Sequence, residues 1–277
     1  MQHNLGDDGF KTSNNTKAAS GDSTKPRIRY HLLDELRGFA VFCMVFYHAF
    51  YTLCDLGVPY FESVLNFFMP AEPFFAGFFI LLSGVCCRLS HSNLSRGLKL
   101  AAVAAAVTGV TYCATAFGID DCVIWFGVLH LLSVGMLCCA VFDFALKRIP
   151  PGVGAVLFFL LFILSYNVEY GSISLGSHVL FELPQSLYKT NMLSFLGFHN
   201  DYFASADYFP ILPWLFLFLC GTSLGIYENR GRFPAFLKRR YIPFFGFLGR
   251  HALLIYILHQ PVIFGITYAV AELVKLF

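Results

Sequence analysis

The sequence predicts an all-α integral membrane protein, a bundle of about seven transmembrane helices. The first observation is composition: of 277 residues, 57% are hydrophobic and 13% are charged, whereas soluble domains carry roughly 25% charged residues. The second is length, because several apolar segments approach the roughly 20 residues that a helix needs to cross the hydrocarbon core. The predicted spans cover residues 38–54, 73–89, 98–117, 123–146, 151–167, 208–227 and 248–274.

The third observation is the distribution of positive charge between the two sides of these spans. If the seven spans alternate in direction, all of the 19 Lys and Arg except Lys189 and Lys275 fall on one side. Positive residues gather on the cytosolic side, so we expect the N-terminus in the cytosol and the C-terminus outside. Residues 1–29 are polar and lack the apolar core of a secretory signal. We therefore expect a disordered cytosolic tail there, an uncleaved first span, and a transmembrane domain over residues 30–277.

The first span places an arginine and a histidine on one helix face. The segment LDELRGFAVFCMVFYH contains Arg37 and His48, which are eleven residues apart. That separation is close to three helical turns, or roughly 16 Å along the axis. Ionisable residues inside a bilayer are costly unless they face a cavity or a partner, so both are candidate functional residues. The ordinary alternatives are an interfacial arginine paired with Asp34 and an imidazole packed against a neighbouring helix.

Two further histidines fall at a depth comparable to that of His48. They are His130 in WFGVLHLLSVG and His259 in LLIYILHQPVIFG. Three helices would thus bring an imidazole to one layer of the membrane, and the three rings could line one polar cavity. The ordinary alternative is strongest for His259, because Pro261 frees a backbone carbonyl that a nearby polar side chain can satisfy.

One acid stands directly before the sixth span. In the segment SADYFPILPWLFLFLCGTSLG, Asp207 is followed by Pro210 and Pro213. A carboxylate at the start of a helix can cap the free N–H groups of its first turn. It can also hold an imidazole in the tautomer that catalysis requires. The sequence leaves both roles open.

Several segments together resemble a known family. The catalytic domain of heparan-alpha-glucosaminide N-acetyltransferase and its bacterial relatives contain, in the same order, segments similar to LDELRGFAVFCMVFYH, FFILLSG (78–84), WFGVLHLLSVG (125–135), DYFPILPWLFLFLCGTSLG (207–225) and GRHALLIYILHQPV (249–262). The spacing of Arg37 and His48 is also similar, more distantly, to the Arg-x10-His pair of the acyltransferase-3 enzymes. The resemblance covers nearly all of residues 30–265.

The resemblance implies an enzyme that takes an acyl group, usually acetyl, from cytosolic acyl-CoA. The acceptor would be an amine or hydroxyl, typically on a sugar or glycan. The match makes His48 the first choice for the catalytic base and puts Arg37 at the CoA end.

Physical reasoning about the residues leads to similar chemistry. Arg37 and Arg250 each stand at the cytosolic start of a span, where guanidinium groups can hold the phosphates of acetyl-CoA. His130 and His259 would line the cavity of His48, with Asp207 as an orienting acid. A histidine at the depth of the thioester can remove a proton from the acceptor or carry the acyl group itself. The sequence leaves both routes open.

A proton-coupled small-molecule transporter is the main alternative function. Intramembrane histidines and a helix interrupted by prolines are typical of such carriers too, but the two halves of the chain show no internal repeat. The nine cysteines lack the spacing of a zinc site, and we find no nucleotide-binding or nucleic-acid-binding pattern. We therefore expect acyl-CoA, a glycan acceptor and the lipid bilayer of the cell (plasma) membrane as partners, and no metal. The chain is shorter than the proteins it resembles, so we expect either a minimal catalytic core or a homodimer in which a second copy closes the cavity.

Overall fold

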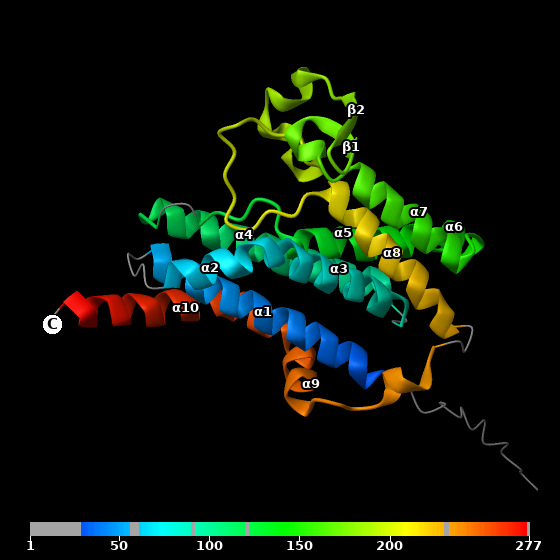
Figure 1. The fold of residues 1–277 in the computed structure, drawn as a ribbon, viewed down its shortest axis with the longest axis horizontal. Helices are drawn as coiled ribbons and strands as arrows, with labels where there is room; N and C mark the ends of the chain where they lie inside the picture. The colour runs from blue at the N-terminus through cyan, green and yellow to red at the C-terminus, as the bar shows by residue number, and fades with distance from the viewer. Residues whose placement is uncertain (1–28, 56–60, 90–91, 120–121, 230–232, 276–277) are drawn as a thin grey trace, which may run out of the picture.

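The computed structural model describes residues 29–55, 61–89, 92–119, 122–229 and 233–275, and over these residues it is a helical bundle (Figure 1). The predicted tail, residues 1–29, therefore lies outside the described residues except for Arg29. The helices are α1 (His31–Asp55), α2 (Glu62–Phe68), α3 (Glu72–Arg88), α4 (Asn93–Ala116), α5 (Val128–Val141), α6 (Asp143–Arg148), α7 (Pro151–Leu164), α8 (Ile211–Asn229), α9 (Pro243–Arg250) and α10 (Ala252–Lys275).

The all-α membrane fold is confirmed. In the described part of the chain, five helical segments are long and apolar enough to cross a membrane: His31–Asp55, Glu62–Arg88, Asn93–Ala116, Pro151–Tyr170 and Ala252–Val270. The apolar parts of α5 and α8 are shorter. Each of the seven predicted spans thus overlaps an apolar helix, although two of these helices fall short of a full span.

Several boundaries differ from the prediction, and α1 and α4 begin earlier than expected, at His31 and Asn93. The second span begins at Glu62, well before residue 73, because Pro70 and Pro73 occupy first-turn positions where a missing N–H costs no helical hydrogen bond. The fourth predicted span starts late, at Val128, after Gly127 in an extended conformation. The last predicted span is divided at His251 into α9 and α10.

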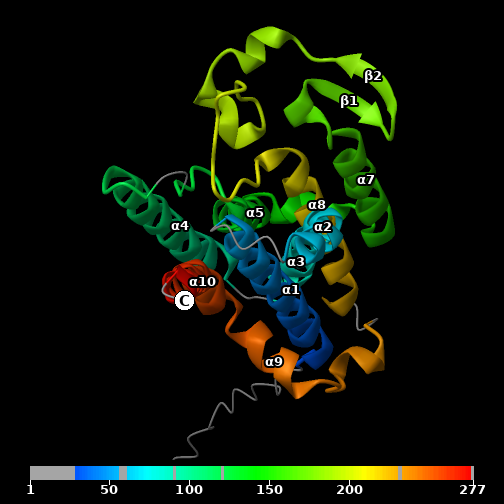
Figure 2. The same ribbon diagram turned by 60° about the vertical axis from the view of Figure 1, so that its left-hand side comes forward.

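Close helix contacts in the bundle depend on glycine. The main pairs are α3 with α8, α1 with α9, α7 with α8, and α4 with α5, and α10 packs on α1 (Figure 2). A Cβ added to Gly84 would lie 2.1 Å from the carbonyl oxygen of Phe218, and one added to Gly221 would lie equally close to that of Leu81. Small residues let two backbones approach in this way inside a membrane. The core between these helices includes the buried side chains of Ile80 and Leu131.

A small non-helical region lies between α7 and α8. It contains a two-stranded antiparallel hairpin, β1 (Ser172–Leu175) and β2 (His178–Glu182), followed by two short 3₁₀ turns. Figure 1 shows the hairpin beyond the end of α7, clear of the other helices. The sequence predicted only a connection here. Because the hairpin stands at one end of the bundle, it leaves the helical architecture unchanged.

Candidate active site

Histidines from two helices far apart in the sequence lie side by side. His48 is half-buried on α1, and His259 on α10 is 8% exposed. Their ring centroids are 5.0 Å apart. The contact between α1 and α10 therefore brings together two of the predicted site residues.

The two histidines form hydrogen bonds to different kinds of group. The side-chain amide of Gln260 bonds Nδ1 of His48 at 2.7 Å, and an amide can offer either an oxygen or an N–H. Nδ1 of His259 bonds the backbone carbonyl of Tyr256 at 2.6 Å. The carbonyl that Pro261 leaves without its helical N–H partner is that of Ile257, so this bond is not the ordinary role considered for His259. Nε2 of His259 is buried and has no hydrogen-bond partner among the described residues.

Asp207 connects this pair to the start of α5. Its Oδ2 accepts a hydrogen bond from the backbone N–H of Val128 at 2.8 Å and another from the hydroxyl of Tyr256. The Tyr256 ring lies 5.7 Å from that of His259, between centroids. Burial raises the pKa of the Asp207 carboxyl, whereas the two hydrogen bonds act in the opposite direction. Asp207 thus caps α5 and reaches His259 through Tyr256.

His130 belongs to the same polar layer but is fully engaged. Its Nδ1 accepts the backbone N–H of Gly127 at 3.2 Å, and its Nε2 lies 3.3 Å from Oγ1 of Thr108 on α4. The Thr108 hydroxyl donates to the carbonyl of Ile124 at 2.6 Å. His130 thus ties the start of α5 to α4. It is linked to the other site residues through Gly127 and Val128, and no direct hydrogen bond joins it to His48 or His259 in the described part of the chain.

Sequence reasoning missed three side chains. Tyr256 and Gln260 flank His259 on α10 and contact predicted site residues, and their sequence signal was only proximity to that histidine. Glu72 was assigned to the connection before residue 73, but it is half-buried at the start of α3. Its charge interacts with Asp207 and with Tyr47, the neighbour of His48. An acid directly before an apolar run was the available signal for Glu72.

The two predicted phosphate-binding arginines lie near each other where α1 packs on α9. Nη2 and Nε of Arg37 donate to the Gly249 carbonyl at 2.7 and 2.9 Å, and Nη2 also bonds Asp34 at 3.0 Å. The pairing with Asp34, considered as an ordinary role, is present. Arg250 follows Gly249 directly, and its side chain is exposed. Arg37 therefore joins two helices, whereas Arg250 is open to a ligand.

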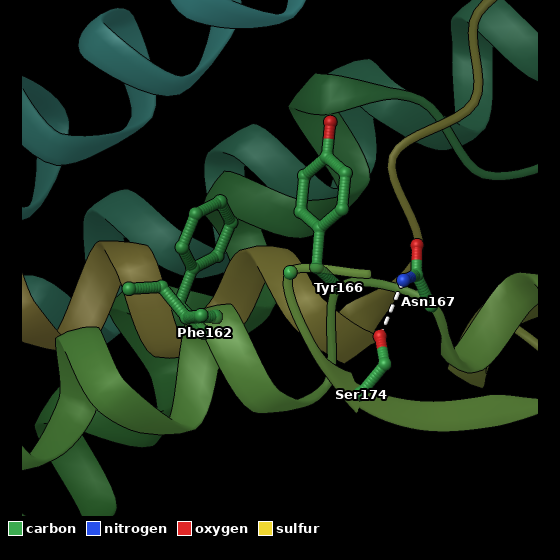
Figure 3. A pocket seen from close by; sticks show the side chains of 6 residues that line it. Phe162, Tyr166, Asn167 and Ser174 are labelled. Carbon is green, nitrogen blue, oxygen red and sulfur yellow. Dashed lines mark hydrogen bonds between the residues drawn. The ribbon is translucent and has the colours of Figure 1, made fainter. Parts of the chain in front are cut away.

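Two cavities lie elsewhere in the bundle. One of about 150 Å³ lies where α7 meets the hairpin, and Figure 3 shows the aromatic rings and the Asn167–Ser174 hydrogen bond at its wall. The other, of about 300 Å³, is apolar and is lined by residues of α5 to α8 and their connections. Neither cavity is lined by a predicted site residue.

These features define a class: a multi-pass helical membrane protein with a layer of histidines, tyrosine and aspartate crossing its bundle. Residues 29–261 match the family model described as heparan-alpha-glucosaminide N-acetyltransferase, catalytic. The chain belongs to this family, which confirms the main resemblance and makes the protein a membrane acetyltransferase that acts on a glycan. Comparison with curated proteins and with solved structures gives no match. The more distant relation to the acyltransferase-3 enzymes stays a prediction.

Proposed function

We propose that the protein transfers an acetyl group from cytosolic acetyl-CoA to an amine or hydroxyl of a sugar or glycan, and that the transfer takes place at His48 and His259. The observation that carries the proposal is the pairing of these two rings from the first and last helices. Chemistry of this kind needs a group that accepts the proton of the attacking amine or hydroxyl. A positioned histidine supplies about 10² to 10⁴ in rate by this means.

The donor is proposed to enter from the end of the bundle where α1 packs on α9. Arg250 is exposed there beside the Arg37–Gly249 contact, and guanidinium groups bind phosphate oxygens well. Arg37 and His48 are about 16 Å apart along α1. The pantetheine arm of acetyl-CoA would cover that distance, so phosphates held near Arg37 and Arg250 would present the thioester to the histidines.

The acetyl group has two routes from thioester to acceptor. In direct transfer, a histidine takes a proton from the acceptor while the acceptor attacks the thioester carbon. In the covalent route, a histidine is acetylated first and then releases the acetyl group. Asp207 and His130 are proposed to support either route from the α5 side, because both bond the first residues of that helix.

Three finer assignments are proposed together. The N-terminus is proposed to lie in the cytosol because of the charge asymmetry of the chain. The location proposed is the plasma membrane. The third proposed assignment is a homodimer, which the mass of the protein in a lipid nanodisc tests directly.

The test is acetyl transfer and acetyl-CoA binding by the purified full-length protein in lipid nanodiscs. We expect transfer from acetyl-CoA to an oligosaccharide that ends in unacetylated glucosamine. His48→Ala should abolish transfer and keep acetyl-CoA binding, and Arg250→Ala should weaken binding without unfolding the protein. His178→Ala, in the exposed strand β2, is the matched control. Failure of the folded wild-type protein to bind acetyl-CoA would contradict the proposal and favour the transporter.

A further inference from the structure

One nitrogen of the histidine pair is both buried and without a hydrogen-bond partner in the described part of the chain. His259 is 8% exposed, and its Nε2 is buried with no hydrogen-bond partner among the described residues. Its nearest described ring is His48, 5.0 Å away between centroids. Buried polar atoms are rarely left unpaired, so such an atom in a native protein calls for a functional explanation.

The protonation pattern of His259 follows from its other nitrogen. Nδ1 bonds the carbonyl oxygen of Tyr256, and a carbonyl can only accept a hydrogen bond. Nδ1 therefore carries the proton, and Nε2 of the neutral ring has a free lone pair. The same reasoning gives the opposite tautomer for His130, whose Nδ1 accepts a backbone N–H. Since an amide can bond either form, Gln260 does not select one for His48.

We propose that Nε2 of His259 is the atom that receives the proton from the acceptor during acetyl transfer. This inference rests on the proposed function and assigns a role within it. The acceptor N–H or O–H donates to Nε2, and the acceptor atom bonds to the carbonyl carbon of the thioester. The carbon–sulfur bond breaks, and the departing thiolate takes the proton from Nε2. The products are the acetylated acceptor and CoA thiol, so no further reactant is needed.

The surroundings of His259 fit this role. Tyr256 supplies the carbonyl that fixes Nδ1, and its own hydroxyl is bonded to Asp207. Asp207 and Tyr256 are thus positioning residues that hold this turn of α10. His48, whose ring lies beside that of His259, is half-buried, and Gln260 is exposed.

Two substitutions distinguish the roles of the two ring nitrogens of His259. In His259→Asn, the amide nitrogen takes the place of Nδ1 and can still donate to the Tyr256 carbonyl, while Nε2 is lost. In His259→Gln, a polar group near Nε2 is kept but has no basic lone pair. We expect both variants to fold and bind acetyl-CoA like the wild type, with kcat reduced by about 10² to 10⁴ and a nearly unchanged KM for the acceptor. His178→Asn is the control for a histidine change outside the site.

The outcomes distinguish this inference from the proposed function. If the wild type transfers acetyl and His259→Asn retains kcat within a few-fold, the role of His259 is overturned while the function stands. If the folded wild type transfers nothing to amine or hydroxyl sugars, both fall. A measurement without acceptor adds a second test: ¹⁵N NMR of labelled histidine, assigned with His259→Asn, should give an unprotonated Nε2 at neutral pH. A protonated Nε2 would overturn the inference independently of any activity.

Discussion

The contact of α1 with α10 and the contact of α4 with α5 both contain a histidine in the same polar layer, but the two histidines are bonded in opposite ways. His130, beside α4, uses both ring nitrogens, accepting from Gly127 and facing Thr108. His259, beside α1, uses only Nδ1 and keeps Nε2 free of described partners. Depth in the membrane therefore does not identify a catalytic histidine. The partners of each nitrogen separate a ring that holds helices together from one that is available for proton transfer.

The largest effect within this comparison is expected from Tyr256→Phe. The change removes the hydroxyl that donates to Asp207 but leaves the backbone carbonyl that binds His259. A hydrogen bond to a charged group is worth about 1.5 to 3 kcal/mol, so we predict at least a tenfold loss of kcat with little change in KM. Steady-state kinetics in nanodiscs measures both. An unchanged kcat would remove Asp207 and Tyr256 from the positioning of His259.

A substitution at the contact of α4 with α5 should lower the stability of the protein. His130→Ala removes the side chain that caps the Gly127 N–H and contacts Thr108. Loss of a helix cap costs about 1 kcal/mol, and thermal unfolding followed by circular dichroism should detect it as a lower melting temperature. A variant with wild-type stability and a kcat as low as that of His259→Asn would reverse the roles of the two histidines.

The last prediction concerns Glu72 and the binding of the acceptor, and its expected effect is no larger than that of His130→Ala. This half-buried carboxylate interacts with Asp207 and has no hydrogen bond to a described residue. Glu72→Gln should raise KM for a cationic amino sugar by about fivefold, the effect of roughly 1 kcal/mol for one partly exposed charge pair. KM for a neutral hydroxyl acceptor should not change. Glu182→Gln, in the exposed strand β2, is the control, and an equal change for both acceptors would contradict an electrostatic role.

The sequence predicted the parts of the site that depend on local periodicity. His48 and Arg37 could be placed on one face of a helix because their spacing is close to whole turns, and the apolar segments marked the helices. The bonding of each histidine could not be predicted, because its environment depends on residues far away in the chain. Gln260 bonds His48 across 212 residues, and Asp207 reaches Val128 across 79. The role of Gly127 as an extended residue before α5 also required the fold.

The two arginines proposed to bind phosphate illustrate the same limit of prediction from sequence. The apolar segments of the sequence placed Arg37 and Arg250 at the starts of predicted spans. Packing of α1 on α9 brings them near each other, because Arg37 bonds the carbonyl of Gly249, the residue before Arg250. This packing is tight, since a Cβ on Gly249 would lie 1.8 Å from the carbonyl oxygen of Asp34. From the sequence, only Arg37 had a candidate partner, Asp34, and its bond to the Gly249 carbonyl could not be predicted. The structure distinguishes the two arginines, because Arg37 is held by backbone and Asp34 while Arg250 remains exposed.

The most direct test of the account is acetyl transfer from labelled acetyl-CoA by the wild type, His259→Asn and His48→Asn, each reconstituted in nanodiscs and checked for acetyl-CoA binding. The account predicts that all three bind acetyl-CoA and that the wild type labels an amino-sugar acceptor. His259→Asn should label it about 10² to 10⁴ times more slowly, and His48→Asn should not label it. Equal labelling by the wild type and both variants would contradict a reaction at the histidine pair.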